Sequence, residues 1–218
     1  MRIALISDIH GNCFALDAAL ADLQSHAVDQ IICLGDTLQG GAQPAETAKR
    51  LQALACPIVM GNADAWLLAE ENDTAESTTE QQREVRLWTL SQLSADDLAF
   101  MRSFQPNVEI ALEERLLLGP YAPAIMTGGH THTQQMRRVG EGLFFNPGSI
   151  GLAYNIFLPE DQFHLDAWAE YAILTAERGC LRLDFHRVPY NVEQLIQIIR
   201  SSGRMHANQI IAEYQRAN

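Results

Sequence analysis

Residues 2–12, RIALISDIHGN, decide how the chain begins to fold, because they join an apolar run to polar side chains and a helix start. The run from Arg2 to Ser7 is short and rich in Ile, which is typical of a strand buried on both faces. Asn12 is a good helix N-cap, and the spaced apolar residues over 14–23 predict a helix after it. Asp8 and His10 therefore stand between a strand and a helix, at the strand's carboxyl end.

The same arrangement recurs in the next fifty residues. Residues 30–34 form a second apolar run, and Asp36 follows it after a glycine. A helix is expected over about 44–55, and residues 57–60 form a third run with Asn62 just beyond it. Alternating strands and helices predict an α/β fold with a parallel sheet and right-handed crossovers. Ligands of such sheets bind at the carboxyl ends of the strands, so these polar residues are expected to form one site.

The second half of the chain is predominantly strand-like, with hairpin turns expected at 140–142 and 177–179. Further strands are expected from 108 to a turn at 113–114, and over 115–118, 124–127, 134–139, 143–145, 171–176 and 180–186. Helices are expected over 83–92 and 94–102, near 192–199, and from about 205. Nothing marks a second domain, so residues 1–218 are predicted to form a single domain that ends in helices over about 191–218.

Composition limits the classes of partner. The 218 residues carry a formal net charge of -12, which repels a phosphate backbone, so nucleic acid is not expected as a bulk partner. No apolar stretch is long enough for a signal segment or a membrane span. The four cysteines show no zinc-type pairing and lie in apolar surroundings, which predicts buried free thiols and a cytoplasmic protein. A homo-oligomer is left open.

Six side chains of metal-binding type follow the predicted strands. Asp8 and His10 are two residues apart, and side chains at this spacing point to the same side of an extended segment. His130 and His132 repeat this spacing, and the Asp36 carboxylate has two oxygens with which it can bridge two ions. Asn62 offers a neutral oxygen. Carboxylate and imidazole ligands without thiolate predict two divalent ions, manganese first, with iron, zinc or nickel as alternatives.

Such a pair of ions suits the hydrolysis of a phosphate ester. The excess positive charge would attract a small phosphorylated substrate, and water bridging the metals would become a hydroxide able to attack phosphorus. The sequence therefore predicts a metal-dependent phosphoesterase. It does not identify the leaving group.

The ordered motifs resemble those of the calcineurin-like metallophosphoesterase superfamily. They are Asp8-Ile9-His10, Gly35-Asp36, Gly61-Asn62-Ala63-Asp64 and Gly129-His130-Thr131-His132, followed by a segment at 146–151 that resembles a small YfcE-like and archaeal phosphodiesterase branch. The resemblance implies a four-layer α/β/β/α sandwich of two mixed β-sheets flanked by helices.

The resemblance also assigns roles to single residues. It implies that one ion is held by Asp8, His10, Asp36 and His132, and the other by Asp36, Asn62 and His130. Asp36, Asn62 and His130 are expected to act in catalysis. Asn12 is expected either to donate to a phosphate oxygen or only to cap its helix, and Asp64 to brace the loop.

Two departures from the family pattern affect the function expected. Ala63 stands where many members have a histidine that protonates the leaving group, which favours phosphodiesters with good leaving groups. The family's isolated His-Gly motif is missing between Leu118 and Thr127. Either this protein has a deletion that weakens the second metal site, or a loop of the natural protein is absent from the sequence.

We predict a phosphodiesterase, with two alternatives. One is a catalytically impaired metal-binding or interaction scaffold on the same fold, and the other is a dinucleoside polyphosphate hydrolase or phosphoprotein phosphatase. The aromatic segment over 151–168 is expected to pack on the second sheet, to form a substrate wall, or to make a dimer contact. Four histidines outside the motifs are expected to be surface or helix residues: His26, His164, His186 and His206.

Overall fold

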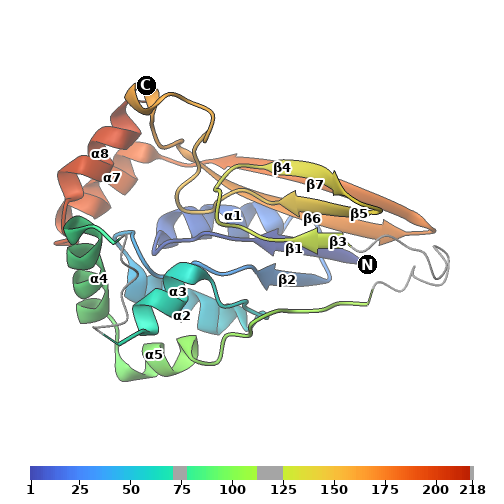
Figure 1. The fold of residues 1–218 in the computed structure, drawn as a ribbon, viewed down its shortest axis with the longest axis horizontal. Helices are drawn as coiled ribbons and strands as arrows, with labels where there is room; N and C mark the ends of the chain where they lie inside the picture. The colour runs from blue at the N-terminus through green and yellow to red at the C-terminus, as the bar shows by residue number, and fades with distance from the viewer. Residues whose placement is uncertain (71–77, 112–124, 217–218) are drawn as a thin grey trace.

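The computed structural model describes residues 1–70, 78–111 and 125–216, which form two β-sheets and a set of helices (Figure 1). The larger sheet has four strands in the order β2-β1-β6-β7. Its strands are β1 (Arg2–Ile6), β2 (Gln30–Cys33), β6 (Trp168–Glu177) and β7 (Cys180–Pro189). Strand β1 pairs in parallel with β2 and antiparallel with β6, so the sheet is mixed.

The third predicted strand, over 57–60, is reduced to two isolated bridges. Ile58 bridges to Cys33 and Val59 bridges to Gln105. Pro57 has no N–H to donate, and its carbonyl accepts from the Cys33 N–H over 3.0 Å, so only a short ladder forms beside β2. The parallel sheet expected from the first three units is therefore shorter than predicted, and its other edge is completed by β6 and β7 from the end of the chain.

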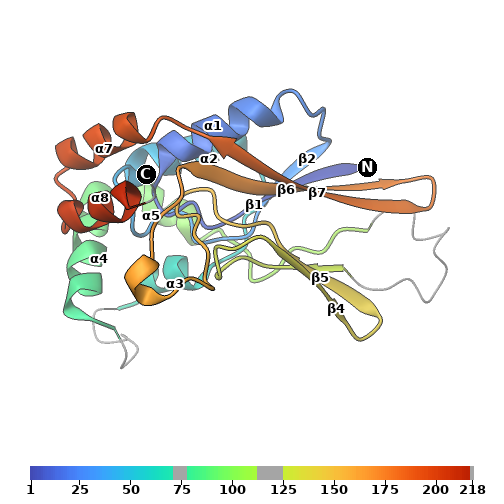
Figure 2. The ribbon, with the colours of Figure 1, turned by 90° about the horizontal axis from the view of Figure 1, so that it is seen from above.

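The smaller sheet has three strands in the order β3-β5-β4. They are β3 (Ile125–Thr127), β4 (Gln135–Val139) and β5 (Gly142–Asn146), with β3 parallel and β4 antiparallel to β5. Figure 2 shows this sheet facing the larger one. A shared apolar cluster lies between them, made by Ile3, Leu5, Ile32, Phe145, Ala172 and Leu174. The predicted fold class, α/β with two mixed sheets flanked by helices, is confirmed.

Helix α1 (Cys13–Leu23) covers the other face of the larger sheet, against β6 and β7, and α2 (Pro44–Leu54) packs beside α1. Their apolar sides enclose the main core with β1, through Ile6, Ala15, Leu16, Ala19 and Leu51. Asn12 caps α1 by accepting from the Ala15 N–H, as the sequence predicts, and Ser94 forms a capping box with Asp97.

The remaining helices gather at one end of the molecule, on the left in Figure 1. They are α3 (Asn62–Leu68), α4 (Glu80–Gln92), α5 (Ala95–Met101), α7 (Val192–Ser201) and α8 (Ala207–Gln215), with a short 3₁₀ turn η1 (Glu160–Gln162) nearby. Within the described ranges, no helix combines the length and apolarity needed to cross a membrane.

The turn at 113–114, the strand at 115–118 and most of the stretch that lacks the His-Gly motif lie outside the described residues. All four cysteines are free thiols, as predicted, but only Cys13 and Cys33 are buried. Cys56 is half-buried, and Cys180 is exposed because it starts β7 at the tip of the β6–β7 hairpin.

Candidate metal centre

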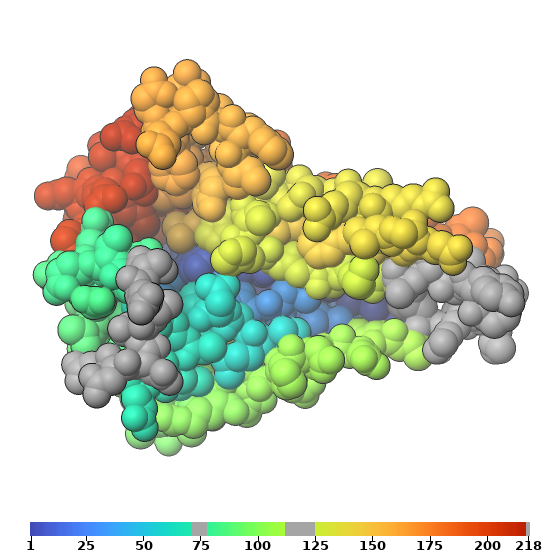
Figure 3. Space-filling model, in the orientation of Figure 1, coloured from blue at the N-terminus to red at the C-terminus, as the bar shows by residue number. Residues whose placement is uncertain are grey.

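The predicted site residues meet at the carboxyl ends of β1 and β2, beside the segment that follows β3. Figure 3 shows the blue N-terminal chain recessed between α3 in cyan, the yellow segment around β4 and β5, and the orange segment after it. The loop after β1 is tied to the loop after β2 by backbone hydrogen bonds. Asp8 N–H donates to the Gly35 carbonyl over 3.0 Å, and His10 N–H donates to the Asp36 carbonyl over 2.9 Å. The sheet pairing thus continues into the site.

Five of the predicted ligands have left-handed backbone conformations, which non-glycine residues rarely adopt. Their φ angles are +52° for Asp8, +50° for His10, +55° for Asp36, +75° for His130 and +52° for His132. Such strain persists only where surrounding contacts hold it, and it is common at functional sites. The strained backbone directs these side chains into one space.

Asp8, His10 and His132 form the first group. The two histidine Nε2 atoms lie 3.0 Å apart, and Asp8 Oδ1 lies 3.3 Å from Nε2 of His132 and 3.8 Å from Nε2 of His10. The other ring nitrogens face carbonyl oxygens: His10 Nδ1 faces Gln39 at 2.7 Å, and His132 Nδ1 faces Leu152 at 2.8 Å. A carbonyl can only accept, so each Nδ1 carries a proton, and each Nε2 presents a lone pair when its imidazole is neutral.

With both imidazoles neutral, three acceptor atoms converge with no donor between them. Such a group repels itself unless a cation lies at its centre, so these residues fit a divalent metal ion. Metal-binding histidines commonly donate their other N–H to a backbone carbonyl, as both do in this site. The donor set of one carboxylate oxygen and two imidazoles suits a transition metal.

Charge and burial act against each other at this group. Burial tends to raise the pKa of Asp8, but hydrogen bonds and charge from His10 and His132 outweigh it and hold that pKa well below its usual range. Burial tends to lower the pKa of His10, but the hydrogen bond and charge of Asp8 outweigh it, so that pKa is raised. The site thus favours a negative Asp8 with positive charge beside it.

Asp36, Asn62 and His130 form the second group. Asp36 Oδ1 accepts from the Ala63 N–H over 2.7 Å, and His130 Nδ1 lies 2.9 Å from one atom of the Asn62 amide. With the amide nitrogen at that place, Asn62 donates to His130 Nδ1 and, over 3.3 Å, to Asp36 Oδ2. With the oxygen there and the His130 proton on Nε2, three acceptors converge, as in the first group. This second orientation fits a cation, and the first satisfies the residues without one.

Asp8 links the two groups, because its carboxylate oxygens accept from the His130 backbone N–H over 3.0 and 3.1 Å. Asp64 braces the second group, as expected. Its buried carboxylate accepts from the N–H of Asp36, of Thr37 and of Gly61, and from the Thr37 hydroxyl. Burial raises the pKa of Asp64, while these hydrogen bonds act in the opposite sense.

Asn12 is buried beside the site with both polar atoms engaged. Its Oδ1 accepts from the Ala15 N–H over 3.1 Å, and its Nδ2 donates to the Gly151 carbonyl over 2.9 Å. This geometry supports the capping role. The substrate-binding role stays a prediction that the geometry does not favour.

Several residues that support the site were not found from the sequence. Ser149 Oγ donates to the Asp8 carbonyl over 2.7 Å, and Asn146 Nδ2 donates to the Gly129 carbonyl over 2.7 Å. Both belong to the 146–151 segment, whose resemblance to a family segment was the only signal. The carbonyls of Gln39 and Leu152 orient the histidines, and nothing in a sequence marks a backbone oxygen for such a role.

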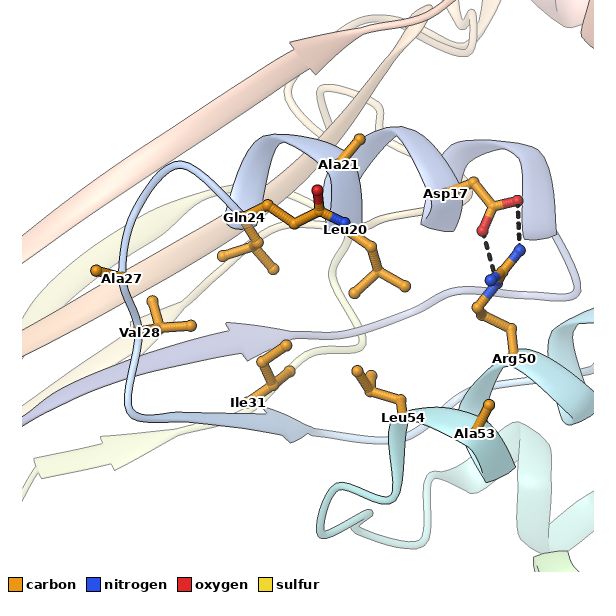
Figure 4. A pocket seen from close by; sticks show the side chains of 11 residues that line it. Asp17, Leu20, Ala21, Gln24, Ala27, Val28, Ile31, Arg50, Ala53 and Leu54 are labelled. Atoms are coloured by element: carbon orange, nitrogen blue, oxygen red, sulfur yellow. Dashed lines mark hydrogen bonds and ion pairs between the residues drawn. The ribbon is translucent and has the colours of Figure 1, made fainter.

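Two cavities lie near the elements that carry the site. One of about 190 Å³ is lined in part by Leu152 and by Tyr154, whose ring lies 5.0 Å from that of His132, but none of the predicted ligands lines it. The other, of about 560 Å³, lies between α1, α2 and β2 with an Asp17–Arg50 ion pair at its rim (Figure 4). It contains none of the predicted ligands, so its size does not make it the site.

The aromatic segment mainly packs. Tyr154 and Phe163 contact each other and the apolar cluster of α7 and α8, whereas Phe157 is 81% exposed. Packing is therefore shown for two of these residues, but against the terminal helices rather than against the second sheet. A substrate wall or dimer contact stays a prediction.

Comparison with known proteins agrees with this geometry. A family model described as the calcineurin-like phosphoesterase superfamily domain matches residues 1–176. The uncharacterized protein MJ0912 of Methanocaldococcus jannaschii is 32% identical over 197 residues, which cover 86% of this chain and 80% of that protein.

Solved structures give the same result. A metallophosphoesterase from Sphaerobacter thermophilus superposes with a TM-score of 0.70 at 25% identity, covering 98% of this chain and 99% of that chain. The hypothetical protein PH1004 from Pyrococcus horikoshii OT3 has a TM-score of 0.74 at 16% identity over 97% and 96% of the two chains, and so supports the fold. The family model includes every residue of both groups, and the chain therefore belongs to the calcineurin-like phosphoesterase superfamily.

Proposed function

We propose that this protein is a divalent-metal-dependent phosphoesterase that acts on small phosphodiesters. The observation that carries the proposal is the pair of neighbouring acceptor groups joined by Asp8, each of which fits a cation. One ion would be held by Asp8, His10, Asp36 and His132, and the other by Asp36, Asn62 and His130. Manganese is the first candidate. The four free cysteines fit a reducing compartment such as the cytoplasm.

Divalent ions in such a site would lower the pKa of a bound water and neutralise charge on a phosphate group. The remaining chemistry belongs to the chain. His130 is exposed, and with Nδ1 turned toward Asn62 and the proposed ion, its proton would lie on Nε2. From there the imidazole can donate to a phosphate oxygen and stabilise the charge that develops in the transition state.

Ala63 supports the choice of diesters. It follows Asn62 at the start of α3, where its backbone N–H binds Asp36 and its methyl group offers no proton to a leaving group. Substrates whose leaving group departs without protonation should therefore react best.

The test is hydrolysis of bis-p-nitrophenyl phosphate by metal-stripped protein, with and without added manganese. We expect manganese-dependent turnover that falls at least about 100-fold in Asp36→Asn, because that change removes a shared charged ligand while it keeps the side-chain shape. Turnover that persists in Asp36→Asn would show that another site or a contaminant is responsible. No turnover with manganese, zinc, nickel or iron would favour the scaffold alternative.

A further inference from the structure

Three other metal-binding side chains meet far from the centre described above. Asp22, His26 and His186 each offer a ligand atom, and these atoms all lie within 4.8 Å of one another. Asp22 is in the last turn of α1, whereas the residues of the centre lie near its first turn. An α-helix rises 1.5 Å per residue, so the stretch of α1 from Cys13 to Asp22 separates the two places by roughly 14 Å.

The distances approach those of a tetrahedral site. Nε2 of His26 lies 3.4 Å from Asp22 Oδ2. Ligands bound at about 2.0–2.1 Å from a tetrahedral zinc ion lie roughly 3.3–3.5 Å apart, so this pair is already at ligand spacing. The rings of His26 and His186 have centroids 4.6 Å apart.

Neighbouring residues hold the three side chains in place. The His186 ring stacks on that of Tyr171, its cross-strand partner, with centroids 4.6 Å apart and planes inclined by 2°. The Tyr171 hydroxyl donates to Asp22 Oδ2, which is the kind of outer hydrogen bond that orients a ligating carboxylate. The His26 backbone N–H donates to the Leu23 carbonyl over 3.0 Å and fixes the turn after α1.

We propose that Asp22, His26 and His186 bind one transition-metal ion of the zinc type, separately from the phosphoesterase centre. Two imidazoles and one carboxylate are a common three-ligand set for zinc, with water in the fourth position. Because its ligands come from the end of α1 and from β7, the ion would fasten this helix to the edge of the larger sheet. Figures 1 and 2 show α1 running along β6 and β7, where this connection would form.

The test measures zinc bound per chain, in manganese-loaded protein, by calorimetry and by metal analysis after dialysis. The variants are His26→Gln and His186→Gln. The matched control is His164→Gln, which removes a histidine paired with Asp166 elsewhere on the surface. Zinc also competes with manganese at the phosphoesterase centre, so the readout is the difference between variants rather than the total.

We expect wild type and His164→Gln to bind one further equivalent of zinc, with a Kd lower by roughly 100-fold or more than in the other two variants. Zinc should raise the Tm of wild type, and this part of the rise should disappear in His26→Gln. Manganese-dependent hydrolysis should be unchanged in all three variants.

Equal zinc stoichiometry and affinity in wild type and His26→Gln would overturn the proposal. An equal loss of zinc binding in His164→Gln would also overturn it. His26 is part-exposed in a turn, so this variant is informative even if His186→Gln folds poorly.

Discussion

Single residues at this centre are fixed by hydrogen bonds to both backbone and side chain. Asp36, in a left-handed conformation, has its N–H and its carboxylate both fixed, by Asp64 and by Ala63. The position of a ligand within the site therefore depends on residues that would never touch a metal or a substrate. Asp64 is the clearest case, because a single buried carboxylate accepts from four donors.

We predict that Asp64→Asn lowers both stability and activity. An amide keeps one oxygen but turns an NH₂ group toward backbone donors, which leaves buried N–H groups without an acceptor. The expected loss in the free energy of unfolding is about 2–4 kcal/mol, measured by urea denaturation. Asp96→Asn, an exposed change in the first turn of α5, should alter it by no more than about 0.5 kcal/mol. Equal midpoints for the two variants would contradict the bracing role.

At the scale of elements, the segment after β3 lies so close to the end of β1 that no side chain fits between Gly129 and Asp8. A Cβ atom added at Gly129 would lie 2.0 Å from Ser7 Oγ and 2.1 Å from Asp8 Oδ2. Gly129→Ala should therefore displace the Asp8 carboxylate and reduce manganese affinity and turnover at least about tenfold. Gly128→Ala is a matched control in the next position, since its Cβ would meet only Phe144 Cε2 at 3.8 Å. Similar turnover in the two variants would show that this close approach does not position Asp8.

Strand β6 carries a buried acid whose ionisation opposes folding. Glu170 is 3% exposed; its Oε1 accepts from Arg187 Nε over 2.9 Å and from Trp168 Nε1 over 3.1 Å, while its Oε2 is buried without a partner among the described residues. Burial raises the pKa of Glu170 above its ordinary value of 4.5, against the effect of these two donors. The folded protein thus holds this proton more tightly than the unfolded chain does.

The sign of the pH dependence follows from this difference. Where the folded state binds more protons, the free energy of unfolding falls as pH rises, from about 4.5 through the folded-state pKa. Glu170→Gln lacks this loss, so the variant should gain stability relative to wild type between pH 4.5 and neutral pH, measured by urea midpoints. Glu177→Gln, at the exposed end of β6, controls for the change in net charge. A difference that is constant with pH would refute the prediction.

At the scale of the whole molecule, local patterns identified strands more reliably than their partners. The apolar runs predicted β1 and β2 and the hairpins of the second half. Nothing in them indicated that β1 pairs with β6, because the two strands are far apart in the sequence. The Met1 amino group, for example, donates to the Ala176 carbonyl across 175 positions. Which strands pair depends on how the sheets and helices pack as a whole, and a short apolar run does not indicate it.

The site shows the same division. All six predicted ligands come together in two groups, because each follows a strand or opens a helix at the same edge. His26 and His186 were expected to be surface or helix residues, and no role was expected for Asp22. Asp22 and His26 lie on a helix and its turn, and His186 is 160 positions away from His26 on β7. Their meeting depends on the antiparallel addition of β6 and β7, which the sequence did not show.

The acidic character of the chain makes metal removal a test of the whole molecule. With a net charge of -12 and acceptor groups that repel themselves, the metal-free protein should be less stable than the loaded one. A ligand that binds only the folded state stabilises it by about 2.7 kcal/mol at roughly 100 times its Kd. In a chain of this length that corresponds to a rise in Tm of roughly 5–10 °C on adding manganese after chelation. Potassium chloride at equal ionic strength screens surface charge without occupying the centre, so it should give a much smaller rise in Tm.

In His132→Gln the rise in Tm should require a much higher manganese concentration, because one ligand of the centre is lost. An equal rise with potassium chloride, or an unchanged manganese requirement in His132→Gln, would mean that the stabilisation arises from the acidic surface and not from the centre.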